Sequence, residues 1–533
     1  MYRTIKRAFV VFCACALLLT FVFYIRQEDP SVNRIALLTP EAYAALVGAQ
    51  TETSDEPFRG ECRIEDTAVF YDEKTRTYYV PQSMETAAYD GDLTWVNPLR
   101  KAYFCPDRLY ADKLSAIAAG HAFRLIVTNG STYFYVNLIF TGLPIVALRY
   151  NDAAHETNSP TTYAAELRLL DPGLADPGRF TVTESVVTFR TRGQTSRYYL
   201  KKSYRVTCYQ RNGKRTRPSF LDLGGTDEWV LLSLYKDPTR VRDMVGQNLW
   251  NALCETNPAA DIPTDRMRFV ELFIDDNYEG LYGLILPMAA PENVPDNCKT
   301  LYKNEYSVFP DNLGRWKQDL PNFLDVAEIK WPQHATDPAL WEPLHQYFEA
   351  FLTVPRTAPY ETLADMLDLS NTVDFALFLQ ATAGSDQLFR NNYYMLLDDG
   401  TFLKTPFDLT TTFGYALFDK PTINIGGILM EHATRDFLYF DTRVLIDANP
   451  QAVVPSMLAR WNELKKTLFS AESLKNAFAE QMAVLTKSGA FDRDAVRWTE
   501  FPVSSDLTKV NEFIDLRAAY MERYMAALSD RLS

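Results

Sequence analysis

The stretch that decides the fold prediction is residues 385–414, SDQLFRNNYYMLLDDGTFLKTPFDLTTTFG. Two apolar runs flank Asp399-Gly400, a dipeptide typical of a two-residue β-hairpin turn. In such a hairpin Asn391 faces Asp408 at the open end, with their Cβ atoms about 5 Å apart. Asp386 lies five residues before Asn391, in the connection that enters the hairpin. Carboxylate and amide oxygens placed in this way favour a hard cation such as Mg²⁺, which keeps waters and substrate phosphates as its other ligands.

The order of these polar residues also indicates a reaction class. A protein-kinase catalytic loop and its metal-binding aspartate follow the same order: an aspartate, four intervening residues, an asparagine, and then a hairpin that ends in aspartate. Asp and Asn at strand ends also cap turns, so a purely structural interpretation stays open. A glycoside hydrolase using Asp386 and Asp408 is a further alternative. It ranks last, because it needs two carboxylates across a sugar ring and not an asparagine beside one of them.

A basic segment lies upstream of the hairpin. Between Arg190 and Arg217 the chain has ten Lys and Arg residues and no acidic one. The run 192–196, Arg-Gly-Gln-Thr-Ser, is expected to be a loop that offers N–H groups, hydroxyls and a guanidinium to one anion, with a lysine on the next strand. This pattern favours phosphate binding, and a solvated basic hairpin is the alternative.

Composition excludes several classes of protein. Hydrophobic residues make up 47% and charged residues 23% of the 533 positions, which are ordinary globular values. The net charge of −14 argues against a surface that binds nucleic acid. Seven Cys and five His, with no CxxC or HExxH pattern, leave little material for a zinc site. Cys62 and Cys105 are the only cysteines between the N-terminal apolar run and Cys208, so an extracytoplasmic location would allow a disulfide between them. The oligomeric state is not indicated.

The N-terminus predicts a membrane anchor. Ala8–Ile25 is an 18-residue apolar run that would span about 27 Å as a helix. Arg3, Lys6 and Arg7 precede it, so the positive-inside rule predicts a single-pass signal anchor with the bulk of the chain extracytoplasmic.

Periodicity predicts the organisation of the rest. Alternating apolar residues indicate strands up to about residue 300, interrupted by one amphipathic helix over DPTRVRDMVGQNLWNALCE, residues 237–255. Beyond about residue 345, helical periodicity dominates. We expect a transmembrane helix (1–26), a stalk (27–57), a small β-rich domain (58–142), a β-rich lobe (143–300) and a helical lobe (301–533).

Five blocks in this order resemble the CotH family of spore-coat, kinase-like proteins. The blocks are FRTRGQTSRYYLKKSYRV, DPTRVRDMVGQNLW, RFVELFIDDNYEGLYGL, RNNYYMLLDDGTFLKTPFDLTTTFG and ARWNEL, within roughly residues 140–530. The resemblance implies an α+β, protein-kinase-like two-lobed fold with a β-rich N-lobe and a helical C-lobe. It also implies transfer of the ATP γ-phosphoryl group, with Mg²⁺, to Ser or Thr of a surface or envelope protein.

The resemblance assigns roles by position. It makes Asp386 the catalytic carboxylate. It places the metal on Asp408 with Asn391 or Asn392. It gives nucleotide binding to Arg192, Gly193, Lys201 and Lys202.

Two positions depart from the family. The family usually has RGNSS or RGNTS where this chain has Arg192-Gly193-Gln194-Thr195-Ser196. The second strand of the hairpin at 269–287 usually ends in glutamate, whereas this chain has Leu286-Pro287. The alternative function is therefore a catalytically dead fold acting as an envelope binding or scaffold protein. The acid that would pair with Lys202 stays open between Glu271 and Asp243.

Overall fold

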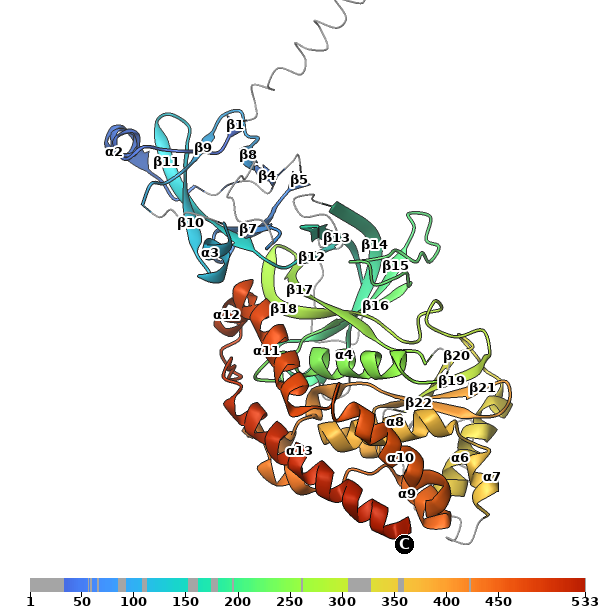
Figure 1. Ribbon diagram of the computed structural model, residues 1–533. Helices are drawn as coiled ribbons and strands as arrows, with labels where there is room; N and C mark the ends of the chain where they lie inside the picture. Colours follow the sequence, from blue (N-terminus) through green and yellow to red (C-terminus); the bar gives the residue numbers. More distant parts are fainter. Residues whose placement is uncertain are drawn as a thin grey trace, which may run out of the picture. The chain divides into compact units, whose positions relative to one another are not determined.

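The computed structural model describes residues 33–55, 57, 60–64, 67–84, 93–107, 113–151, 162–173, 181–193, 196–259, 262–304, 327–352, 359–420 and 423–532. The chain forms two compact units (Figure 1). The first comprises residues 1–147, 170–181 and 273–278, and the second comprises residues 148–169, 182–272 and 279–533.

The first unit is built from two sheets. One has the order β1 (Asn33–Arg34), β8 (Leu93–Trp95), β4 (Cys62–Ile64), β5 (Thr67–Ala68). The other has the order β2 (Ala36–Leu37), β9 (Lys101–Phe104), β10 (Ala122–Thr128), β11 (Thr132–Thr141), β7 (Thr77–Pro81), β6 (Phe70–Asp72), with β3 (Thr51–Glu52) also paired to β11. Two helices accompany them, α2 (Pro40–Ala49) and α3 (Lys113–Ala118).

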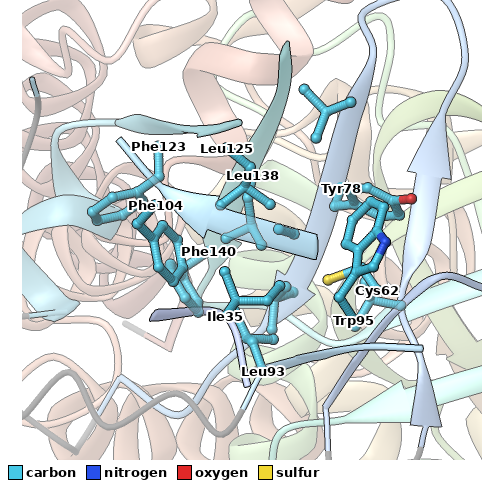
Figure 2. Packing of buried hydrophobic residues seen from close by; sticks show 14 of the residues in the cluster. Ile35, Cys62, Tyr78, Leu93, Trp95, Phe104, Phe123, Leu125, Leu138 and Phe140 are labelled. Carbon is cyan, nitrogen blue, oxygen red and sulfur yellow. The ribbon is translucent and has the colours of Figure 1, made fainter. Parts of the chain in front are cut away.

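Aromatic side chains fill the core of this unit. Figure 2 shows Tyr78 and Trp95 at one end of the cluster and Phe104 and Phe123 at the other. The Tyr78 and Trp95 rings meet edge to face at a centroid distance of 5.9 Å, an arrangement that aromatic pairs prefer. The alternation of apolar residues in the sequence therefore places one face of each strand in a common core.

Cys62 and Cys105 do not form the disulfide that the sequence allowed. Both are buried free thiols, and Cys105 belongs to a different apolar cluster from Cys62. Burial raises the pKa of Cys105 to about 11, which keeps this thiol protonated at neutral pH.

A closed seven-stranded barrel replaces the predicted β-rich lobe. Its order is β12 (Ile145–Tyr150), β13 (Tyr163–Asp171), β14 (Thr181–Arg192), β15 (Ser203–Tyr209), β16 (Glu228–Leu232), β18 (Asn277–Leu286), β17 (Arg266–Ile274), and it closes on β12. The predicted two-lobed, protein-kinase-like layout is therefore wrong. An open sheet and a barrel have the same alternation along each strand, and only the pairing of the two edge strands distinguishes them.

A helix follows the barrel strand β16, as its periodicity predicts. This helix, α4, spans Arg242–Glu255 and buries Met244, Val245 and Leu249. The Asp237 carboxylate accepts a hydrogen bond from the Arg242 backbone N–H at 2.8 Å, which satisfies one of the unpaired donors at the start of the helix.

The rest of the second unit combines a four-stranded sheet with helices. The sheet has the order β20 (Ala327–Trp331), β19 (Cys298–Asn304), β21 (Asn392–Leu397), β22 (Phe402–Pro406). A hairpin, β23 (Tyr415–Lys420) and β24 (Ile423–Ile428), follows it. The helices are α6 (Glu342–Leu352), α7 (Tyr360–Ala364), α8 (Leu369–Thr382), α9 (Phe440–Ala448), α10 (Pro450–Leu464), α11 (Ala471–Lys487), α12 (Ala490–Arg497) and α13 (Thr508–Ser529). Helix α8 packs against β22, and α11 packs against α4 (Figure 1).

The predicted single-pass membrane anchor is not upheld. Within the described ranges, no helix is both long enough and apolar enough to cross a bilayer. Helix α13 has 22 residues but contains charged side chains such as Glu512, Asp515 and Arg517. The apolar run Ala8–Ile25 lies outside the described residues.

Candidate active site

The hairpin of β21 and β22 has a different register from the predicted one. Asn392 pairs with Pro406, so Asn391 does not face Asp408 across the ladder. The loop has three residues, because the Leu397 N–H bonds the Thr401 carbonyl at 2.9 Å. Gly400 occupies the left-handed region with φ of 93°, which suits a three-residue hairpin loop. The turn was placed correctly, but the pairing is offset by one residue.

Asn391 and Asp408 nevertheless line the same cleft. Both residues leave the ladder in the left-handed conformation, with φ of 58° at Asn391 and 55° at Asp408. The Asn391 carbonyl still accepts a hydrogen bond from the Phe407 N–H at 3.0 Å. Positive φ is unusual for residues other than glycine, and Asn and Asp tolerate it best. Asn391 and Asp408 therefore both line the cleft through this backbone conformation, although they are not paired across the ladder.

The segment around Asp386 is tied to the end of β22. Gln387 is fully buried, and its Nε2 donates to the carbonyls of Phe407 at 3.0 Å and Asp408 at 2.9 Å. The Asp386 carboxylate accepts a hydrogen bond from Arg390 Nη2 at 3.0 Å. Both Asp386 and Arg390 line the cleft with Asp408. The side chain of Gln387 thus fixes the distance between the two aspartate-bearing segments.

Helix α4 adds a third carboxylate, Asp243, to the cleft. Its Oδ1 accepts a hydrogen bond from the Leu409 N–H at 2.8 Å, and its Oδ2 accepts one from Thr410 Oγ1 at 2.5 Å. Burial and, to a smaller extent, the neighbouring Asp408 carboxylate raise the pKa of Asp243 to about 7. A carboxylate whose pKa is raised by a neighbouring carboxylate indicates a negative potential, which favours a cation.

Asp408 has an exposed side chain in the cleft, and surrounding protein atoms partly desolvate its carboxyl group. This desolvation raises the pKa of Asp408, and the Asp386 carboxylate raises it further. Arg192, Lys303 and Arg390 lie close enough to lower it in part. The cleft therefore brings together acidic groups suited to a metal and basic groups suited to an anion.

The cleft has two adjoining parts. The larger part is lined by polar residues that include Arg192, Gly193 and Ser203 from the barrel side. The smaller part has apolar walls from Val230, Leu232, Met267, Ile285, Pro287, Tyr393 and Phe407. Arg192, Asp243, Lys303 and Asp408 line both parts, so the two are continuous.

Three of the residues assigned from the sequence lie elsewhere. Lys201 is fully buried, and its Nζ donates to Asp494 Oδ1 at 2.6 Å and also bonds the Leu281 carbonyl. The Lys202 Nζ donates to the Arg197 carbonyl at 2.8 Å. Asn392 is buried, and its Nδ2 donates to the Gln387 carbonyl at 2.7 Å. None of these three lines the cleft, whereas Arg192, Gly193, Asp386, Asn391 and Asp408 do.

The acids considered as partners of Lys202 have other contacts. Glu271 is fully buried and bonds Arg493 Nε at 2.8 Å, and Asp243 bonds Leu409 and Thr410. Pro287 lines the apolar part of the cleft, where its ring adds apolar surface.

Lys303 is a cleft cation that the sequence reasoning missed. It lies on β19 with only 3% of its surface exposed, and its Nζ is 4.6 Å from the centroid of the Phe407 ring. Lys236, also in the cleft, has its Nζ 4.2 Å from the Tyr199 ring. The strand 298–304 contains two lysines, Lys299 and Lys303, of which only Lys303 is buried. Lysine within this largely apolar strand was the available signal, because a buried lysine requires compensation.

The match to a family model covers this entire cleft. The model of the CotH kinase protein family matches residues 189–521, more than half of the chain. The chain belongs to the CotH kinase family. No curated protein shows a significant match to the sequence. The resemblance predicted from five sequence blocks is thus confirmed, and all the cleft residues named above lie inside the CotH kinase match.

CotH kinase membership suggests ATP and Mg²⁺ as the molecules to test against the cleft. Among the described residues, no group of three or more His, Cys, Asp and Glu side chains is arranged to hold a metal ion. The cleft instead offers a mixed set, with Asp386, Asp408 and the Asn391 amide near Arg192 and Lys303. Mg²⁺ commonly binds one or two carboxylates and keeps waters and phosphate oxygens as further ligands. The donor chemistry of the cleft therefore fits Mg²⁺ bound together with a nucleotide.

Proposed function

We propose that this CotH kinase family member transfers the γ-phosphoryl group of ATP to a serine or threonine hydroxyl of a protein. The observation that carries the proposal is the shared cleft, in which Asp386, Asn391 and Asp408 face the same space as Arg192 and Lys303. Phosphoryl transfer needs positioning and charge stabilisation more than covalent chemistry, and a cleft with carboxylates and cations supplies both.

The apolar part of the cleft suits the nucleotide base. Its walls include Val230 and Ile285 from the barrel and Phe407 from the hairpin. Small-molecule sites are mostly apolar, with a few polar groups that fix orientation. A flat heteroaromatic base placed here leaves the phosphates in the polar part, because the two parts are continuous.

Arg192 and Lys303 are the proposed phosphate ligands. Both line the two parts of the cleft, where a chain of phosphates would pass. Arginine contacts phosphate with two parallel hydrogen bonds, and lysine acts as a compact positive charge. Gly193 follows Arg192 with φ of 94° and lines the cleft. This glycine allows the backbone to approach a phosphate closely.

Asp408 and Asn391 are the proposed Mg²⁺ ligands. When bound, the ion would screen charge between the phosphates and orient them for transfer. Asp408 supplies the negative charge, and the Asn391 amide supplies a neutral oxygen. The Asp408 carboxylate raises the pKa of Asp243, and the Asp386 carboxylate raises that of Asp408, which supports this assignment because a cation relieves such repulsion.

Asp386 is the proposed group that orients the acceptor hydroxyl and takes its proton. The hydroxyl oxygen forms a bond to the γ-phosphorus as the bond from this phosphorus to the β–γ bridging oxygen breaks, so ADP leaves. Arg390 donates a hydrogen bond to Asp386 Oδ1 at 3.0 Å and holds the carboxylate in place, so that Oδ2 can accept the proton of the hydroxyl. An Asp386→Asn variant is expected to bind ATP but to transfer phosphate about 10²- to 10⁴-fold more slowly.

The test measures binding and transfer separately. Calorimetry with the purified chain, ATP and Mg²⁺ is expected to give saturable binding that depends on Mg²⁺ in the wild type and in Asp386→Asn, but not in Asp408→Asn. Incubation with γ-labelled ATP and casein or the chain itself as acceptor is expected to label Ser or Thr only with the wild type. Glu255→Ala, an exposed change on α4, is the matched control.

The same experiment distinguishes the alternative. Absence of ATP binding by the folded wild type would overturn the kinase proposal and favour a catalytically inactive binding protein. Equal transfer by wild type and Asp386→Asn would remove Asp386 from the mechanism.

A further inference from the structure

We propose that Asp243 is a positioning residue, which acts through the turn at residues 408–410 to hold Asp408 ready for Mg²⁺ and nucleotide. This inference rests on the proposed function of Asp408. Asp243 was considered from the sequence only as a partner of Lys202, and its contacts in the structure point to a different role.

The first support is the pair of hydrogen bonds from Asp243 to the turn. One carboxylate oxygen accepts the Leu409 N–H at 2.8 Å, and the other accepts the Thr410 hydroxyl at 2.5 Å. The two donors are the next two residues after Asp408. Because one rigid carboxylate binds both, it fixes the direction in which the chain leaves Asp408.

The second support is the conformation that the turn must keep. Asp408 has φ of 55°, a region that is unfavourable for a non-glycine residue and persists only where the surroundings enforce it. Thr410 Oγ1 lies 3.4 Å from Asp408 Oδ1 while it donates to Asp243. The Thr410 hydroxyl therefore links the carboxylate of Asp243 to the carboxylate of Asp408.

The third support is the close packing of α4 on the same turn. A Cβ atom added at Gly246, three residues after Asp243, would lie 2.9 Å from Leu409 Cβ. Only glycine allows this approach of the helix backbone to the turn. Asp243 and Gly246 thus contact Leu409 by a hydrogen bond and by packing, respectively.

The fourth support is that α4 itself begins at a fixed place. The Asp237 carboxylate accepts hydrogen bonds from the Arg242 N–H at 2.8 Å and from the Thr239 N–H at 3.0 Å. The Arg242 guanidinium also bonds Asp237 and lies 4.7 Å from the centroid of the Tyr415 ring. Arg242, the residue before Asp243, is therefore held in place. This fixes the start of the helix and so the position of Asp243 relative to the turn at residues 408–410.

The test compares substitutions that differ only in the contacts they keep. In Asp243→Asn the amide oxygen accepts the Leu409 N–H and the amide nitrogen donates to Thr410 Oγ1, so the turn stays held. In Asp243→Ala both contacts are lost. In Thr410→Val, of these two contacts only the hydrogen bond from the Thr410 hydroxyl to Asp243 is lost. The readout is the affinity for the non-hydrolysable analogue AMP-PNP, measured by calorimetry with and without Mg²⁺.

A positioning role predicts a graded result. Asp243→Ala is expected to weaken Mg²⁺-dependent AMP-PNP binding about 10- to 100-fold, the range for residues that orient metal ligands. Thr410→Val is expected to fall between wild type and Asp243→Ala, and Asp243→Asn to stay within about 3-fold of wild type. Binding without Mg²⁺ is expected to stay unchanged in all three, with Glu255→Ala as the control on the same helix.

Three outcomes would overturn the inference. If Asp243→Asn loses as much affinity as Asp243→Ala, Asp243 is itself a metal ligand. If Asp243→Ala lowers thermal stability but leaves Mg²⁺ dependence intact, its role is structural only. If Asp408→Asn loses Mg²⁺ dependence while Asp243→Ala and Thr410→Val keep it, the turn does not need positioning. A wild type without Mg²⁺-dependent binding would instead contradict the proposed function of Asp408.

Discussion

Replacing Lys201 with methionine tests whether this lysine is a buried structural cation or a nucleotide ligand. Its side chain is fully buried, and it donates to Asp494 and to the Leu281 carbonyl. Burial lowers the pKa of Lys201 from 10.5 to about 8, more than the attraction of Asp494 raises it. Methionine has a similar length, is apolar, and does not titrate.

The sign of the pH effect follows from the lowered pKa. Between about pH 8 and pH 10.5 the unfolded chain binds a proton at this position that the folded chain has released, so stability rises with pH across this window. One pKa unit corresponds to about 1.4 kcal/mol, so the full change corresponds to about 3 kcal/mol. Most of this change falls between pH 7 and pH 10.

The measurement is urea unfolding of wild type and Lys201→Met at pH 7 and pH 10 and constant ionic strength, followed by tryptophan fluorescence. Other titrating groups are common to both chains and cancel in the difference. The free energy of unfolding of the wild type, relative to the variant, is expected to increase by about 2–3 kcal/mol from pH 7 to pH 10. Lys299→Met, at an exposed position on β19, is expected to follow the wild type at both pH values.

A difference that stays constant or shrinks with pH would refute the reasoning. The second readout is ATP binding at pH 7. We expect Lys201→Met to retain it, because the Nζ is directed at Asp494 and does not line the cleft. Loss of ATP binding by a folded variant would instead support the nucleotide-binding role assigned from the sequence.

The remaining predictions concern the cleft and two glycines. Lys303→Met is expected to weaken ATP binding by about 1.5–3 kcal/mol in calorimetry, as for a lost charged hydrogen bond, and unchanged affinity would exclude Lys303 as a phosphate ligand. Gly280→Ala is expected to destabilise the fold by about 2–4 kcal/mol in urea unfolding, because φ is 94° and the new Cβ would collide with Asp494 Oδ1; wild-type stability would contradict this packing. Gly400→Ala has open space around its Cβ, so only the backbone cost of about 1–2 kcal/mol is expected, with ATP affinity intact; a change in affinity would show that the turn communicates with the cleft.

The sequence predicted the cleft residues better than it predicted the geometry around them. Asp386, Asn391 and Asp408 were identified from a turn dipeptide and residue types, and they line one cleft. Their register was wrong because a DDG sequence supports either a two- or a three-residue loop, and the choice depends on the Gly400 φ and the flanking hydrogen bonds. Local pattern therefore located these residues, while backbone conformation decided how they meet.

Long-range pairing accounts for the other errors. Lys201 was assigned to nucleotide binding by its position in the family resemblance, but its partner Asp494 is 293 residues away in the sequence. Barrel closure likewise depends on the meeting of β12 and β17, which strand alternation does not encode. Such contacts depend on the complete fold, and no short window of sequence contains both partners.

Helix α12 is translated long after the residues with which its charged side chains form ion pairs. Asp494 pairs with Lys201 and Arg240, while Arg493 and Arg497 of the same helix pair with Glu271 and Glu279. At about 5–20 residues per second, a ribosome needs about 15–60 s to translate the 293 residues between Lys201 and Asp494. During that interval the barrel strands are made before the α12 residues that pair with Lys201, Arg240, Glu271 and Glu279. A nascent chain that ends before α12 therefore lacks the oppositely charged side chains that this helix supplies to buried positions of the fold.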